Sequence, residues 1–323
     1  MIDLLRLLEG TNAYKTVKAD KAANRLSHAY LILSQDKQNL GEYLKLFARL
    51  IAAESSDERA NELIDKGFHP DVLTFPRKGD AVLKEDVAEI IEESFLKPVE
   101  LDRKLFLIVG GESMNPTSQN KLLKTLEEPP ANVHILIGAT SEYPLLTTLK
   151  SRVKKLAIPP FSEAELFEAL KGECADSEKL AEAISCGDGT VGKALALYGD
   201  ENLSQTVDVA VDTYVNMVSS RNVLEYSEKI TGKSKDIKEF LSVLGLINRD
   251  YMLFINGEED AVFNKKLLER VKSAKGFTAG AVVYAADKIV EAEKRISANG
   301  NPQAVLERLL FAILEGKHKW RKL

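Results

Sequence analysis

Three short runs of apolar residues, at positions 29–33, 105–109 and 133–137, mark the first half of the chain. Apart from one histidine, each run is apolar at successive positions, which is typical of strands buried on both faces of a parallel sheet. Helical periodicity occupies intervals between them, at residues 40–53 and 82–96. Strands that alternate with helices predict an α/β fold, a parallel sheet with flanking helices joined by right-handed crossovers.

The pattern changes after Pro159 and Pro160, because proline has no N–H for a sheet ladder and disfavours helix at the preceding residue. We therefore expect residues 1–160 to form the first domain. Ser162 and Glu165 form a capping box that begins the first of three short predicted helices. These helices predict a small helical lid domain over residues 161–200.

From residue 201 onward the periodic segments are helical. The clearest ones cover residues 237–254, 281–296 and 304–314. They predict an all-α domain over residues 201–323, which ends in a basic tail at 317–322. We expect that tail to be a frayed, solvated terminus.

Composition narrows the function classes. The chain has 323 residues, a net charge of −5 and a pI near 5.6, which argues against a protein that holds nucleic acid by its own field. The longest uncharged run, 129–141, has 13 residues and is too short for a membrane helix. Two cysteines, Cys174 and Cys186, lack metal-ligand spacing, so they predict buried thiols in a reducing, cytoplasmic setting.

The segment with the most specific information is residues 120–130, NKLLKTLEEPP. A helical apolar stripe precedes the two prolines, which must end the helix. Glu127 and Glu128 then lie at the helix C-terminus, where the macrodipole disfavours negative charge. Such departures are more frequent at functional or interface positions. A solvated helix end, helped by Lys121 and Lys124, is an equally open interpretation.

This block resembles the NALLKTLEEPP segment of bacterial clamp-loader subunits, members of the AAA+ group. Further resemblances follow in the family's order: NRLSHAYL at 24–31, HPD at 69–71, the sensor-1 position at Thr140, LTTLKSRV at 146–153, and ANGNPQ at 298–303 followed by Leu306 and Glu307. The resemblance spans nearly the whole chain. It implies a AAA+ base domain, a lid, and a helical collar that joins the subunit to others.

The residues for ATP chemistry are missing at the positions where the family has them. A phosphate-binding loop needs glycines, a lysine, and a serine or threonine for Mg²⁺. At 34–41 the sequence is SQDKQNLG, with Leu40 at the position of the lysine and Gly41 at that of the threonine. Asp36 would repel a phosphate. The loop is therefore not expected to bind ATP in the usual way.

Two other positions agree with this interpretation. Val109 and Gly110 occupy the positions of the acids that hold Mg²⁺ and polarise water in active members. Glu112, two residues further on, is interpreted as a loop residue. Gly192 stands where active members carry the sensor-2 arginine, beside Lys193. The isolated chain is therefore predicted not to be an enzyme, although it would belong to the DNA-directed DNA polymerase holoenzyme.

Ser151 and Arg152 match the family's trans-acting arginine motif, with Val153 in place of the usual cysteine. The resemblance implies that Arg152 enters a neighbouring subunit's nucleotide site and stabilises charge on the γ-phosphate. The alternative is an ordinary surface arginine in a salt bridge.

The resemblance also implies partners: the gamma/tau ATPase and delta subunits and, through the complex, the sliding clamp and primed DNA. It implies no membrane. No cofactor is expected, because ATP would be bound by partner subunits and residues 52–68, where the family often has a zinc module, contain no cysteine. Three alternatives stay open: a gamma-like ATPase that uses Lys37 or Lys193, the clamp-opening delta subunit, and a scaffold outside replication.

Overall fold

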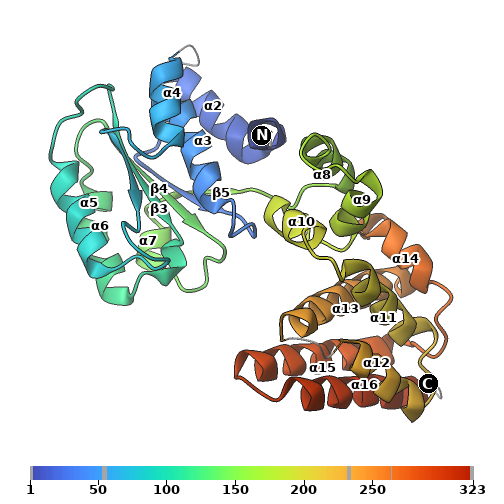
Figure 1. The fold of residues 1–323 in the computed structure, drawn as a ribbon. Coiled ribbons are helices and arrows are strands. Elements are labelled where there is room, and N and C mark those ends of the chain that lie inside the picture. Colours follow the sequence, from blue (N-terminus) through green and yellow to red (C-terminus); the bar gives the residue numbers. More distant parts are fainter. Residues whose placement is uncertain (1–2, 53–56, 231–233, 263, 321–323) are drawn as a thin grey trace. The chain divides into compact units, whose positions relative to one another are not determined.

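The computed structural model describes residues 3–52, 57–230, 234–262 and 264–320, and the chain divides into two compact units (Figure 1). Unit 1 comprises Met1–Phe161 and Thr190–Gly192. Unit 2 comprises Ser162–Gly189 and Lys193–Leu323. The division of the second half into a lid, 161–200, and a collar, 201–323, stays a prediction.

Unit 1 is built on a five-stranded parallel sheet in the order β2-β3-β4-β1-β5. The strands are β1 Ala29–Leu33, β2 Val72–Phe75, β3 Lys104–Val109, β4 Val133–Ala139 and β5 Lys154–Ala157. The apolar runs correspond to β1, β3 and β4, so the predicted α/β fold class is confirmed. The apolar pattern did not reveal β5, because it is an edge strand on which only Leu156 is buried.

Helices cover both faces of this sheet, with α3 on one face and α5 and α6 on the other (Figure 1). The helical segments of unit 1 are α1 Leu4–Gly10, α2 Asn12–Ala22, α3 Leu40–Ala52, α4 Glu58–Asp65, α5 Lys84–Ser94, the 3₁₀ turn η1 Gly111–Ser113, α6 Pro116–Glu127 and α7 Thr147–Lys150. Leu31 and Phe106 pack toward Val87 and Leu122 of α5 and α6. With both faces covered, the central strands have no polar side, which explains the continuous apolar runs.

The His-Pro-Asp segment before β2 has a structural role in this fold. Asp71 is fully buried, and its carboxylate accepts hydrogen bonds from the backbone N–H groups of Val99, Glu100 and Leu101 at 2.7, 2.7 and 2.8 Å. His69 Nδ1 accepts the backbone N–H of Asp71 at 3.1 Å. The segment therefore ties the start of β2 to the connection that leads into β3.

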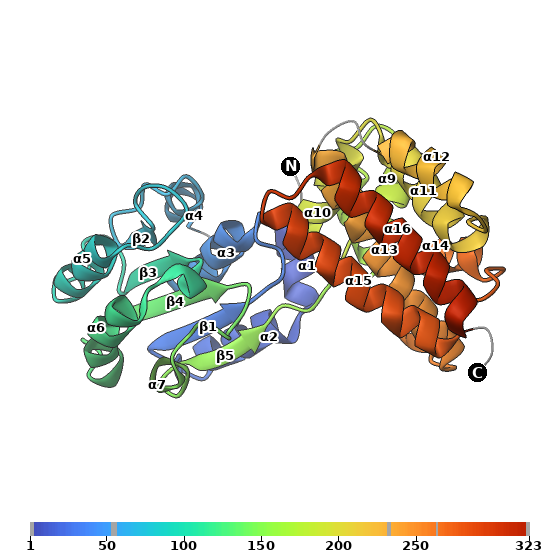
Figure 2. The same ribbon diagram turned by 90° about the horizontal axis from the view of Figure 1, so that it is seen from below.

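The regular elements of unit 2 are all helices among its described residues. Its segments are α8 Glu163–Leu170, α9 Ser177–Ser185, α10 Val191–Tyr198 apart from its first turn, α11 Leu203–Val215, α12 Ser220–Ile230, α13 Ser234–Ile255, η2 Glu259–Ala261, α14 Lys265–Val271, α15 Ala279–Ser297 and α16 Pro302–Lys319. The capping box of Ser162 and Glu165 begins α8 as predicted. The long helices α15 and α16 lie side by side (Figure 2). Within the described residues, no helix has the length and apolarity that crossing a membrane requires.

The expectation of a frayed tail is wrong for its first residues. Lys317 lies within α16 and is buried, and its ammonium donates to the backbone carbonyls of Tyr214 and Met217, both at 2.9 Å. It also lies 5.0 Å from the ring centroid of Phe277. Burial with three partners holds the end of α16 against α11. Arg321 and Lys322 lie outside the described residues.

Candidate functional site

The loop after β1 is closed by the carboxylate of Asp36, which is only 3% exposed. Asp36 accepts the backbone N–H of Asn39 at 3.2 Å and the amide of the Asn39 side chain at 2.9 Å. It also accepts the Tyr43 hydroxyl at 3.1 Å. Burial, reinforced by the charge of Asp36, raises the pKa of Tyr43. The amino end of α3, where a phosphate would be attracted, therefore carries an anion of the protein itself.

Gly192 completes the shell around this carboxylate within unit 1. Its backbone N–H donates to Asp36 Oδ2 at 3.2 Å. A Cβ atom at position 192 would lie 2.6 Å from Asp36 Oδ1 and 2.8 Å from Gln38 Oε1. The position at which active family members carry the sensor-2 arginine therefore has no room for a side chain in this arrangement.

Leu40 and Gly41, at the expected lysine and threonine positions, begin α3. Leu40 is 1% exposed, and its Cγ would lie 3.0 Å from a Cβ at Gly138 of β4. Its side chain is thus part of the packing between α3 and the sheet. Lys37 is exposed in the preceding loop.

The end of β3 carries a glycine turn in place of an acid pair. Gly110 has φ +75°, a left-handed conformation that a side chain would strain. Glu112 in η1 accepts the backbone N–H of Thr140 at 3.0 Å and its hydroxyl at 2.5 Å. Glu112 and Thr140, both marked in the sequence analysis, therefore form hydrogen bonds with each other at the carboxyl end of the strands.

A buried glutamine, Gln119, joins α6 to the segment that leads into α7. Its Nε2 donates to the carbonyls of Met114 at 2.9 Å and Pro144 at 3.2 Å, and its Oε1 accepts the N–H of Leu146 at 2.7 Å. Leu146 is the N-cap residue of α7. One side chain thus determines where α7 begins relative to α6.

Arg152 follows the C-terminus of α7 and is held on two sides. Its Nη1 donates to the Thr148 carbonyl at 2.8 Å and to Ser151 Oγ at 3.2 Å. Its Nη2 lies 2.6 Å from Glu127 Oε1 at the end of α6, and the Arg152 side chain is 33% exposed. Ser151 Oγ donates to Thr148 at 2.9 Å.

The topology separates Arg152 from the loop of Asp36. In the parallel pairing of β1 with β5, Tyr30 is opposite Lys154 and Leu33 is opposite Ala157. Arg152 precedes the amino end of β5, whereas Asp36 follows the carboxyl end of β1. The four residues of β5 alone span roughly 13 Å. Arg152 therefore lies at the amino end of the strands, opposite the loop where a nucleotide bound by the same chain would lie.

Sequence reasoning marked Glu127 and Arg152 separately and missed their ion pair. No local signal joins them, because 24 residues separate them along the chain. The available hint was the unfavourable carboxylate at the end of α6, which needs a cation nearby.

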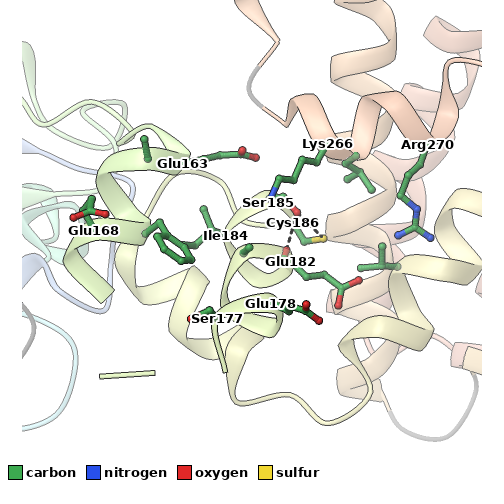
Figure 3. A pocket seen from close by; sticks show the side chains of 15 residues that line it. Glu163, Glu168, Ser177, Glu178, Glu182, Ile184, Ser185, Cys186, Lys266 and Arg270 are labelled. Atoms are coloured by element: carbon green, nitrogen blue, oxygen red, sulfur yellow. Dashed lines mark hydrogen bonds between the residues drawn. The ribbon is translucent and has the colours of Figure 1, made fainter. Parts of the chain in front are cut away.

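A cavity of about 760 Å³ in unit 2 involves none of these residues (Figure 3). Glu163 of α8 and Glu182 of α9 line it on one side and Lys266 and Arg270 of α14 on another. Burial raises the pKa of Cys186, which also lines it, to about 12, so the thiol stays protonated at neutral pH. Among the described residues no group of three His, Cys, Asp or Glu is arranged to hold a metal ion.

Comparisons with known proteins agree with the motifs. A family described as "DNA polymerase III, delta subunit" matches residues 10–162. DNA polymerase III subunit delta' of Bacillus subtilis is 26% identical over 94% of this chain and 94% of its own length. The subunit delta' of Escherichia coli is 31% identical over 45% of this chain and 44% of its own length. A crystal structure of a DNA polymerase III gamma subunit-related protein from Thermotoga maritima covers 95% of this chain and 100% of its own, with 20% identity and a TM-score of 0.47.

The predicted resemblance to the clamp-loader subunits is thereby confirmed. Within that class, the chain is related to the subunits of DNA polymerase III named delta prime.

Proposed function

We propose that the chain is a non-hydrolysing, delta-prime-type subunit of the clamp loader, which acts as a stator and supplies Arg152 in trans to the ATP site of a neighbouring gamma/tau subunit. The delta subunit, the sliding clamp and primed DNA would be its further partners in the cytoplasm. ATP hydrolysis by that neighbour would drive loading of the clamp onto primed DNA.

The observation that carries this proposal is the separation of Arg152 from the loop of Asp36. Arg152 lies at the amino end of the strands and Asp36 follows their carboxyl end, so Arg152 cannot reach a nucleotide in its own chain. An arginine that is one-third exposed can reach a phosphate presented by another subunit. Its planar, permanently charged fork suits a phosphoryl group in the transition state.

The loop around Asp36 supports the absence of hydrolysis in this chain. A phosphate there would meet a buried carboxylate already bonded to Asn39, Tyr43 and Gly192. Leu40 contributes no charge, and the turn at Gly110 contributes no acid. These features favour a non-hydrolysing subunit over a gamma-like ATPase that uses Lys37 or Lys193.

Substitution of Arg152 in the reconstituted clamp loader tests the proposal. A trans-acting arginine is worth on the order of 10³ or more at the site it serves, so Arg152→Ala should nearly abolish hydrolysis there. DNA-stimulated ATP turnover should fall several-fold, while size-exclusion chromatography shows an intact complex. Lys155→Ala is the matched control, because Lys155 is an exposed cation on the adjacent strand. Unchanged turnover in an assembled Arg152→Ala complex would contradict the proposal.

A further inference from the structure

The hydrogen bonds of Arg152 leave part of its guanidinium uncommitted. A guanidinium has five N–H protons. Thr148 and Ser151 accept hydrogen bonds from Nη1, and Glu127 forms an ion pair with Nη2 at 2.6 Å. Among the described residues, Nε–H has no hydrogen-bond acceptor, and Nη2 has no contact besides its ion pair with Glu127. Arg152 is therefore held by protein atoms and still has N–H groups on Nε and Nη2 available for an outside acceptor.

Glu127 is the member of this arrangement that local structure does not require. It is the last residue of α6, where the helix dipole disfavours a carboxylate. Thr148 and Ser151 belong to the same local segment as Arg152, whereas Glu127 contacts Arg152 from a different helix, α6. The ion pair is partly exposed, with Glu127 at 48%, and such a pair contributes little to stability. Its consequence is geometric, because it adds a contact on Nη2 to the two hydrogen bonds that Nη1 makes within its own segment.

We propose that Glu127 is a positioning residue for Arg152, which holds the guanidinium in the orientation that presents Nε–H and Nη2–H to the γ-phosphate of a neighbouring subunit. This inference rests on the proposed trans role of Arg152. Without Glu127, only the Nη1 hydrogen bonds would hold the guanidinium, and the further ordering needed at each hydrolysis event would oppose catalysis.

Steady-state kinetics of the reconstituted complex test the inference. Ordering one mobile side chain corresponds to an effect of about 3- to 10-fold. We therefore expect Glu127→Ala to lower the kcat for ATP by about that factor and to leave KM unchanged, because Arg152 acts in the transition state. Glu127→Gln, which keeps an acceptor oxygen, should lose less.

Glu128→Ala is the matched control, since Glu128 is the next residue, is exposed, and its side chain has no partner among the described residues. Its kinetics should equal those of the unsubstituted complex. Equal losses in Glu127→Ala and Glu128→Ala would overturn the inference, because the effect would then follow charge and not contact with Arg152.

A double-mutant cycle separates this inference from the proposed function. In an Arg152→Ala background, Glu127→Ala should cause no further loss of kcat, because the residue that it positions is gone. A further loss would overturn the inference. So would full activity or a rise in activity for Glu127→Ala when Arg152→Ala is impaired. An unimpaired Arg152→Ala would instead overturn the proposed function itself.

Discussion

Asp36 and Arg152 lie at opposite ends of the strands of one parallel sheet. Asp36 follows the carboxyl end of β1, and Arg152 precedes the amino end of its neighbour β5. In a parallel sheet, every loop that follows a strand lies at the carboxyl end of the strands, and every loop that precedes a strand lies at their amino end. The end with Asp36 is closed by the protein's own carboxylate, and the end with Arg152 carries a partly exposed guanidinium that is paired with Glu127.

The isolated chain is expected not to bind ATP, and restoring the missing lysine alone should not change this. Leu40→Lys would place an ammonium in the packing between α3 and Gly138, with no partner to offset its desolvation. We expect a loss of about 3 kcal/mol or more in the free energy of unfolding. Urea titration measures the stability, and isothermal calorimetry with MgATP measures binding.

Lys37→Ala is the control for that experiment, because Lys37 is exposed in the same loop. Its stability should change by less than about 0.5 kcal/mol. Tight binding of MgATP by the unsubstituted chain that is lost in Lys37→Ala would favour the gamma-like ATPase instead.

Gln119 is expected to matter for both folding and the placement of α7. Gln119→Leu removes the partner of the Leu146 N–H and of two carbonyls, which should lower the free energy of unfolding by about 2–4 kcal/mol. The amide of Leu146 should exchange faster with deuterium, because its acceptor is gone. Lys121→Gln, an exposed change on the same helix, should affect neither measurement. Normal exchange at Leu146 in the Gln119→Leu protein would contradict this role.

His134 predicts a loss of stability in mild acid. Burial lowers the pKa of His134, whose Nδ1 lies 2.8 Å from the Ser27 carbonyl. As the pH falls below about 6.5, the unfolded chain takes up a proton before the folded chain does. The free energy of unfolding should therefore fall between pH 7.5 and 5.5. Thermal or urea unfolding across this range measures the effect.

The comparison variant is His134→Asn, which retains a donor for the Ser27 carbonyl and does not titrate. Its stability should depend less on pH over the same interval. Identical slopes in the unsubstituted and His134→Asn proteins would show that another group is responsible.

Much of the base sheet could be predicted from the sequence, and for a simple reason. Strands β1, β3 and β4 are covered on both faces, so each must be apolar at nearly every position, and a continuous apolar run is visible in one sequence. Strand β5 lies at the edge with Lys154 and Lys155 exposed, so its pattern carries no such signal. The prediction of a frayed tail was wrong for a related reason. The sequence does not distinguish a lysine that donates to two buried carbonyls, as Lys317 does, from a solvated lysine.

The sequence by itself determined the α/β class, the family resemblance and the absence of a lysine, a threonine and an acid pair at the expected positions. Those conclusions depend on residue types and spacing alone. Only the tertiary structure revealed that the Asp36 carboxylate lies at the amino end of α3 and that Glu127 forms an ion pair with Arg152. Both depend on side chains brought together from distant segments, and packing determines such contacts through distances and orientations that spacing along a chain does not encode.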